Sequence, residues 1–418
     1  MSQKSNLLPT IILGVLFFVF GFITWINGTL IPYLKIACEL NNFQSLLVAF
    51  AFYISYFVTA LPSSWILQKT GFKNGMVLGL LTMVVGALLF IPAAYTRTYM
   101  LFLTGLFIIG TGLSILQTAV NPYVTIVGPI ESAAKRISIM GICNKLAGVI
   151  APIILGAIIL SDADNLTTEL AQLDVTAKAV KLDQLAERVI LPYISMAILL
   201  IGLAIMVYFS PLPEVSESES EQTGAINSNT KSSIIHFPNL VLGVIALFLY
   251  VGAEVIAADT IGSYGQSQNI PLSESKNFPS FTLAAMVIGY IIGIFTIPKY
   301  ISQEKALAIS ASIGILFGTL AILTNGYVSV LFIALLGLAN ALMWPAIWPL
   351  AIKGLGRFTQ LGSALLIMAI AGGALLPLLY GYLADLSFIG YKKAYLVLIP
   401  CYAFIIYYSV SGFKKTKW

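Results

Sequence analysis

A polar stripe interrupts a long apolar stretch of the chain, where "GLSILQTAVNPYVT" occupies residues 112–125. Gln117 and Asn121 are four residues apart, so they share one face of a helix. Pro122 has no backbone N–H and leaves the carbonyl of Thr118 without its helical donor. Such groups are costly against lipid and suit water or a polyol. Hydrogen bonds between packed helices are the alternative, and the length of the stripe favours a cavity.

Three ionisable residues, Lys145, Glu254 and Asp259, also fall inside apolar stretches. Each costs about 2.5–3.5 kcal/mol at the centre of a membrane helix. A structural ion pair is the plain alternative, yet pairing Lys145 with one acid leaves the other acid over. We therefore expect Lys145 to contact a substrate, and Glu254 or Asp259 to handle a coupling ion.

Amides and tryptophans complete the set of candidate binding residues. Indole rings lie flat on the apolar face of a sugar while amides bond its hydroxyls, and apolar walls with a few placed polar groups are usual in binding sites. An interfacial belt is the alternative for the tryptophans, but Trp344 lies deep in its stretch. These further candidates are Asn27, Asn144, Asn340, Trp344 and Trp348.

Elements that position such residues must cross a membrane. The 418 residues are 59% hydrophobic and only 9% charged, whereas soluble domains carry about a quarter charged residues. Spans need about 20 apolar residues, and the first stretch is too long for a signal peptide. The sequence predicts an all-α membrane protein with twelve spans, near 9–32, 44–67, 73–94, 98–126, 135–160, 189–209, 237–263, 278–299, 304–323, 327–351, 357–383 and 392–413.

Two polar segments divide this series. Residues 161–188 mix charged residues with leucine and alanine, which favours a surface helix, and residues 210–236 read as a serine-rich acidic linker. We therefore expect an N-terminal six-helix bundle (1–209), a cytoplasmic linker (210–236) and a C-terminal six-helix bundle (237–418). Lysine and arginine are more frequent in the loops on the side of both termini, which places both termini in the cytoplasm.

The two halves also share a weak internal repeat. A shift of 227 residues lays Gly110 over Gly337, and a shift of 231 residues lays Gly21 over Gly252 and Gly28 over Asp259. Parallel repeats of this kind are found in transporters whose substrate site lies near the membrane midplane. We therefore expect spans 1, 4, 7 and 10 to line a central cavity.

The whole chain resembles the fucose–galactose–glucose symporter family of the major facilitator superfamily. The resemblance rests on "GFITWINGTLIPYLK", "LFIIGTGLSILQTAVNPYVT", "FLYVGAEV" and "LLGLANALMWPAIWPLAIKGLGRF". A degraded form of the superfamily's loop motif, "QKTGFKNG", also lies at 68–75. The resemblance implies twelve helices, alternating access and cation-coupled uptake of a hexose through the inner membrane.

Two positions depart from the proton-coupled fucose permeases of that family. The family aspartate of span 1 corresponds to Gly28 in "NGTLIP", and the family glutamate of span 4 corresponds to Gln117 in "LQTAVNP". Both coupling carboxylates are therefore missing. Glucose and galactose relatives often carry the glutamine, which favours those sugars, while fucose and N-acetylglucosamine stay open.

Other functions fit the sequence less well. One histidine and three scattered cysteines provide neither a catalytic constellation nor a metal site, so we expect no enzyme and no cofactor beyond a coupling H⁺ or Na⁺. The basic residues are dispersed in short loops, so nucleic acid is not an expected partner. The expected partners are a hexose and membrane lipid, with the protein a monomer. An uncoupled hexose uniporter remains the alternative.

Overall fold

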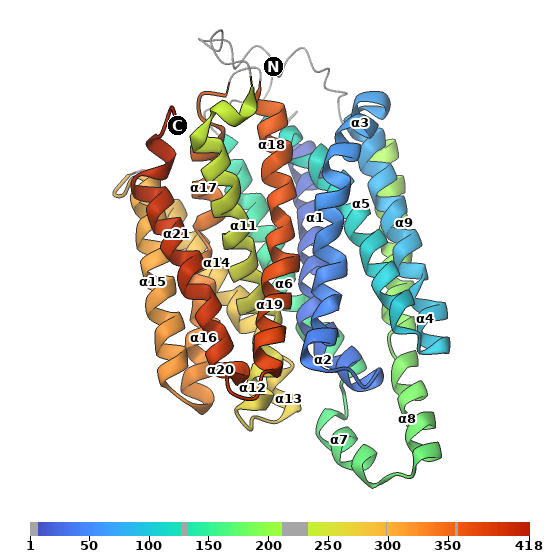
Figure 1. Cartoon of the computed structure of the whole chain (residues 1–418). Coiled ribbons are helices and arrows are strands. Elements are labelled where there is room, and N and C mark those ends of the chain that lie inside the picture. The colour runs from blue at the N-terminus through green and yellow to red at the C-terminus, as the bar shows by residue number, and fades with distance from the viewer. Residues whose placement is uncertain (1–6, 127–132, 211–232, 298, 356–357) are drawn as a thin grey trace.

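The computed structural model describes residues 7–126, 133–210, 233–297, 299–355 and 358–418. It is an elongated bundle of helices that run roughly along one axis (Figure 1). The helix α1 (Leu7–Trp25) begins, and the described chain ends, at one end of the bundle, here called the terminal end. The surface helices α7 (Ala163–Gln172) and α8 (Val175–Glu187) lie at the opposite end, here called the distal end.

Twelve helical segments of the described chain are long and apolar enough to cross a membrane. The first span joins α1 to α2 (Asn27–Ala37). The second and third spans share the long helix α3 (Asn42–Leu88), which turns at Gly71 with a left-handed φ of 75°. The third span continues into α4 (Phe90–Thr96), and the remaining spans of this group are α5 (Tyr99–Ile126), α6 (Ala133–Ile159) and α9 (Ile190–Phe209).

The other six spans follow residue 237 and begin with α11 (Pro238–Asp259), which is continued by α12 (Ile261–Ser267). After the short α13 (Leu272–Ser275) come α14 (Phe278–Thr296), α15 (Gln303–Leu323), and α16 (Gly326–Asn340) with α17 (Met343–Ile352). The last two spans are α18 (Thr359–Met368) with η5 (Ala369–Ala371) and α19 (Gly372–Asp385), then α20 (Gly390–Ala394) with η6 (Tyr395–Val397) and α21 (Leu398–Val410). The short η3 (Ile234–His236) precedes α11, and η7 (Gly412–Lys414) follows α21.

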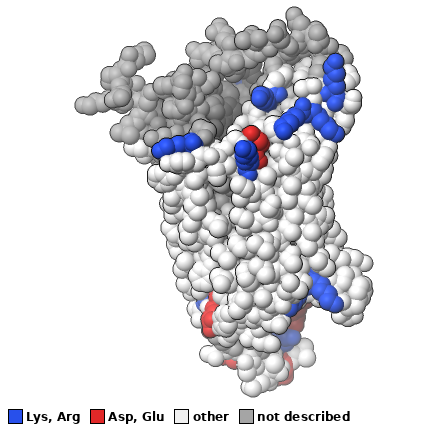
Figure 2. Space-filling view, turned by 90° about the vertical axis from the view of Figure 1, so that its left-hand side faces the viewer, with Lys and Arg blue, Asp and Glu red and all other residues white. Residues whose placement is uncertain are grey.

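The charge distribution matches a protein immersed in a bilayer. A broad belt around the middle of the bundle has no charged side chain on the face shown in Figure 2. Lysines and arginines prevail at the terminal end, while both signs mix at the distal end. Helices suit this belt because their backbone groups hydrogen-bond within the segment, and no water is available in the membrane core. The predicted twelve-span, all-α architecture is confirmed.

Three of the four spans predicted to line a cavity have a break in their helix. The first span breaks at Ile26 and the tenth at residues 341–342, both well inside the span, and the helix of the seventh breaks at Thr260, after Asp259. Beside the break in span 7, both the hydroxyl and the backbone N–H of Thr260 donate to the carbonyl of Ile256, at 2.7 and 3.2 Å. Pro345 has no N–H for the carbonyl of residue 341. Interrupted helices place free backbone groups where a ligand is bound in transporters.

Glycine contacts give the internal repeat a structural basis. A Cβ on Gly110 would meet Ser55 of the second span at 2.2 Å, and one on Gly337 would meet the carbonyl of Thr282, in the eighth span, at 1.9 Å. The residues matched by sequence therefore mark the same close helix pair, span 4 on span 2 and span 10 on span 8. Gly21 and Gly252 likewise pack on the fifth and eleventh spans.

The segment 161–188 forms two helices, α7 and α8, where one was expected. Asp174 caps α8 by accepting a hydrogen bond from the N–H of Ala177 at 2.7 Å. Of the predicted linker, residues 211–232 lie outside the described residues.

Candidate functional site

A buried ion pair lies at mid-depth and joins the two groups of spans. Lys145 of α6 donates to Glu254 of α11 with an Nζ–Oε1 distance of 2.8 Å. Both residues are 7% exposed. The Lys145 ammonium also lies 4.1 Å from the ring centroid of Trp25 on α1, a favourable cation–π contact. Spans 1, 5 and 7 therefore meet at one charged centre.

Asn144 fixes the indole ring beside this pair. Its Oδ1 accepts a hydrogen bond from Trp25 Nε1 at 3.3 Å, and its Nδ2 donates to the carbonyl of Phe17 at 3.4 Å. Gly148 allows the close packing, because a Cβ there would come within 2.6 Å of the Trp25 ring. The arrangement brings an indole ring, an amide and an ammonium together, largely buried and in contact with one another in this conformation. These groups are of the kinds that suit a sugar ring and its hydroxyls.

A second polar group lies about one and a half helical turns further toward the distal end. Asp259 is 1% exposed, and neither of its carboxyl oxygens has a hydrogen-bonding partner among the described residues. Asn27 is fully buried, and its amide is likewise unpaired within the described chain. The two residues lie beside the breaks in spans 1 and 7. The backbone of Gly28 adjoins that of α11, since a Cβ on Gly28 would lie 3.4 Å from the carbonyl of Ala258.

Gln117 donates from Nε2 to the hydroxyl of Tyr56 at 3.1 Å. This contact connects spans 4 and 2. The side chain of Asn121, the other half of the predicted stripe, lies outside the described residues. The backbone of α5 is helical through both positions.

The tryptophans of span 10 stack on each other. The ring centroids of Trp344 and Trp348 are 5.5 Å apart with an interplanar angle of 24°, and Trp344 also lies 6.5 Å from Tyr250 of α11. Asn340 faces a neighbouring helix, where its Oδ1 accepts from the hydroxyl of Tyr402 at 3.0 Å. That contact matches the helix-packing alternative, although Asn340 Nδ2 has no partner in the described structure.

Sequence reasoning missed the tyrosines that surround these groups. Tyr53, Tyr56, Tyr250 and Tyr402 are all buried at the site or beside it. The only available signal was "FYISYF" in span 2, where two tyrosines three residues apart share a helix face. A tyrosine is common in apolar spans, so spacing alone did not single these residues out.

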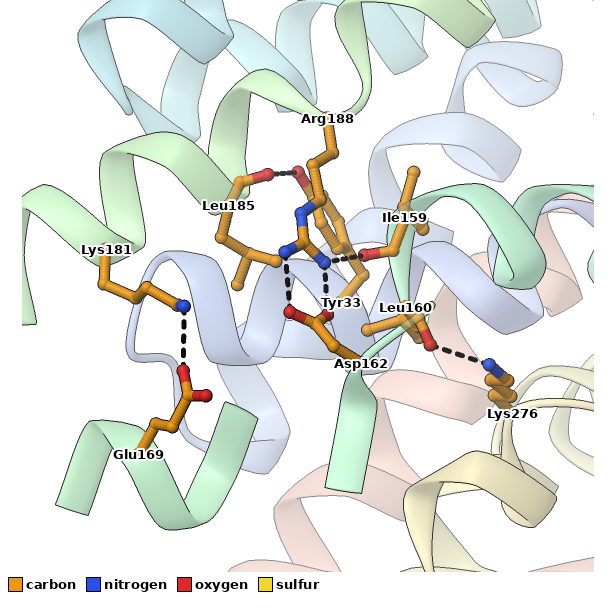
Figure 3. Close-up of polar contacts among 9 residues, drawn as sticks. All are labelled: Tyr33, Ile159, Leu160, Asp162, Glu169, Lys181, Leu185, Arg188 and Lys276. Atoms are coloured by element: carbon orange, nitrogen blue, oxygen red, sulfur yellow. Dashed lines mark hydrogen bonds and ion pairs between the residues drawn. The ribbon is translucent and has the colours of Figure 1, made fainter. Parts of the chain in front are cut away.

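The two groups of spans are bonded to each other at the distal end. Asp385 accepts from the backbone N–H of Phe43 at 2.8 Å and from the side-chain amide of Asn42. Lys276 donates to the carbonyl of Leu160 at 2.7 Å (Figure 3). Pro279 packs against Gly28, where a Cβ would meet its ring at 2.9 Å. These contacts close the distal end over the mid-depth site.

Other features offer less for chemistry. A groove of about 440 Å³ lies between α7 and α8, lined by residues such as Leu173 and Lys181, and these helices lie beyond the apolar belt. No group of three or more potential metal-ligating acids, histidines or cysteines occurs among the residues that the structure describes. The mid-depth residues can therefore bind hydroxyls and hold charge or protons.

Two interlocked groups of six spans, with polar residues buried between them at broken helices, define a secondary transporter. The sequence profile of the Major Facilitator Superfamily matches residues 13–368. A protein named "Glucose/galactose transporter" from Brucella abortus (strain 9-941) is 37% identical over 99% of this chain and 96% of its own length. The "L-fucose-proton symporter" of Escherichia coli (strain K12) is 28% identical over 98% of this chain and 94% of its own length.

A solved structure agrees with these sequence relatives. The crystal structure of the Major Facilitator Superfamily transporter FucP in the outward conformation aligns with a TM-score of 0.74 and 28% identity, covering 97% of this chain and 98% of that chain. The chain belongs to the Major Facilitator Superfamily and, within it, to the fucose–galactose–glucose symporter family. It is a multi-pass membrane transporter of sugars and not an enzyme.

Proposed function

We propose that the protein takes up glucose or galactose together with a cation, by alternating access across the bacterial inner membrane. The observation that carries the proposal is the mid-depth centre where Trp25, Asn144, Lys145 and Glu254 meet across the two halves. The name of the Brucella relative supports the choice of sugar. Gln117 supports it too, since the family's glucose and galactose members often carry glutamine at that position.

We assign the sugar-binding residues by the type of group that each side chain offers to a sugar. Gln117, Asn121, Asn144 and Lys145 bind hydroxyls, and Asn27 and Asn340 contribute amides. Trp344 and Trp348 form an apolar wall for the sugar ring. When the site is empty, Lys145 pairs with Glu254, and sugar hydroxyls replace part of that pairing. The coupling charge that the family carries in spans 1 and 4 belongs here to span 7, on Glu254 or Asp259.

Residues 1–209 and 237–418 form the two moving halves, and residues 210–236 link them. The terminal end faces the cytoplasm, because lysines and arginines concentrate there (Figure 2). Sugar enters from the distal end, which the contacts of Asp385 and Lys276 close in the described conformation. We expect the monomer to be sufficient for transport, with no bound cofactor apart from the coupling ion.

Proteoliposomes test this proposal. Labelled glucose, galactose, fucose and N-acetylglucosamine are offered separately, under an imposed proton gradient, an imposed sodium gradient, or neither. Accumulation of glucose or galactose above equilibrium under one gradient supports coupled uptake. Equilibration without accumulation under either gradient indicates a uniporter instead, and preference for another of these sugars corrects the substrate.

A further inference from the structure

The two acids of span 7 lie in different surroundings, and the difference separates their roles. Glu254 is neutralised by Lys145 at 2.8 Å. Asp259, five residues further along, is buried to 1% exposure, and within the described chain it has no hydrogen-bond donor at either oxygen. A buried carboxylate with no donor costs far more free energy than a neutral carboxylic acid. The surroundings of Asp259 therefore suit its protonated form.

The charged and titratable neighbours of Asp259 reinforce this reading. Glu254 on the same helix and Lys145 on α6 are within electrostatic range of it, and so is Tyr53 on α3. The single cation nearby already pairs with Glu254. Next to Asp259, the hydroxyl of Thr260 donates to Ile256 and contacts Tyr395 of η6 at 2.9 Å. No neighbour among the described residues is left to balance a second negative charge.

We propose that Asp259 is the proton-carrying site of this transporter, separate from the Lys145–Glu254 pair, and that its protonation permits closure of the distal end. The inference rests on the proposed function and names the coupling ion and its carrier. Closure packs Gly28 against Pro279 and Ala258 and removes Asp259 from water. A charged Asp259 opposes that burial, and a neutral one does not.

A proton fits the geometry better than a sodium ion. Sodium needs several oxygen ligands around it, commonly hydroxyls, amides and carbonyls beside a carboxylate. The described structure joins no hydroxyl or amide to either carboxyl oxygen of Asp259. One proton neutralises the acid without further ligands.

The first test is neutralisation of the side chain in full-length protein in proteoliposomes. In Asp259→Asn, proton-driven accumulation of glucose should fall to the passive level, while exchange of labelled for unlabelled sugar continues. The matched control is Glu274→Gln, the same kind of neutralisation at an exposed acid of α13, which should accumulate sugar as the wild type does. Undiminished accumulation in Asp259→Asn overturns the proposal. Loss of exchange in a correctly folded variant, or wild-type accumulation driven only by sodium, also overturns it.

A second measurement needs neither a variant nor a sugar. Dicyclohexylcarbodiimide adds to protonated carboxyls in apolar surroundings, and mass spectrometry of the wild-type protein locates the adduct. Labelling of Asp259 that falls as the pH rises, with little labelling of Glu254, is the expected result. The proposal is wrong if Asp259 stays unlabelled or if the extent of its labelling does not change with pH. Should the wild type move no hexose at all, the proposed function fails while this labelling still decides the state of Asp259.

Discussion

The distal end and the mid-depth site contain similar polar side chains in opposite states. At the distal end, Arg188 donates to both carboxyl oxygens of Asp162 and to the carbonyl of Ile159 (Figure 3). Tyr33 likewise donates to the carbonyl of Leu185 at 2.5 Å. At mid-depth, Asp259 has no hydrogen-bonding partner among the described residues. Tyr33 and Asp259 are almost equally buried, at 0% and 1% exposure, so the two regions differ in whether the buried polar group has a partner.

That contrast separates groups that hold the fold from groups that bind. Satisfied polar groups lower the energy of one conformation and resist change. Unsatisfied buried groups cost about 1–3 kcal/mol each, and a fold keeps them where a ligand or a proton compensates the cost in part of a cycle. The Lys145–Glu254 pair lies between these cases, because it is satisfied but bridges two halves that must move apart.

Removal of Lys145 should have the largest effect. Lys145→Ala leaves the Glu254 carboxylate buried without its cation, and breaking a buried pair from one side typically costs about 3–5 kcal/mol. We expect a marked fall in the Tm of the purified protein and loss of uptake. Thermal unfolding monitored in detergent gives the first quantity, and proteoliposome uptake gives the second.

The double variant Lys145→Met with Glu254→Leu serves as the control. It removes both charges and fills their volume with apolar atoms, which is often neutral for stability. Its Tm should recover most of the loss, but its uptake should not. Recovered uptake in the double variant would make the pair purely structural and would remove it from the transport site.

Gly28→Ala should disturb the distal closure itself. The added Cβ would meet the rigid ring of Pro279 at 2.9 Å, and overpacking of this kind costs about 1–3 kcal/mol. Because the clash exists only when the halves are closed, the distal-open conformation should gain population by about tenfold. Spin labels across the distal end would measure the shift. Gly318→Ala, where nothing lies within 4 Å of the new Cβ, should leave the distances unchanged.

Gln117→Ala tests whether the mid-depth site binds sugar. Loss of one buried amide partner should cost about 1–3 kcal/mol, or roughly ten- to a hundredfold in affinity for sugar. Equilibrium binding of labelled glucose measures it, with the exposed Gln184→Ala as a control. Affinity equal to that of the wild type would remove Gln117 from the site and leave it a packing partner of Tyr56.

Periodicity and composition predicted the spans well because the membrane permits few structures. Predicted span 4 (98–126) and α5 (Tyr99–Ile126) differ by one residue at their start. The breaks in spans 1, 7 and 10 were less predictable. Pro345 follows the break in span 10, but no proline lies within four residues of the breaks at Ile26 and Thr260.

The sequence indicated which residues belong to the candidate site, but not how they are arranged. Lys145 was expected to contact a substrate, with an ion pair as the alternative, and two acids were available in span 7 for such a pair. Choosing between Glu254 and Asp259 required the relative positions of α6 and α11, which depend on contacts far apart in sequence. The contact of Lys145 with Trp25 lay beyond sequence reasoning for the same reason. Polar residues inside an apolar span indicate a functional site, but the residues that they contact depend on how the helices pack.

Substitution of Arg188 should have the smallest effect, and it tests whether the polar contacts at the distal end stabilise the fold. Its hydrogen bonds keep the pKa of Asp162 below the usual range of an aspartate. A carboxyl with a lowered pKa adds stability that is complete above its unfolded pKa, near 4, and is lost as the pH falls through the folded value. Asp162 is about a third exposed, so screening limits the contribution to about 1 kcal/mol. Arg188→Gln should therefore lower Tm by about 1–3 °C at pH 7, and the gap to the wild type should narrow below about pH 4. Transport should be little changed, because Arg188 and Asp162 lie within the same half of the protein. A Tm difference that stays constant with pH, or a large loss of uptake, would contradict a purely structural role.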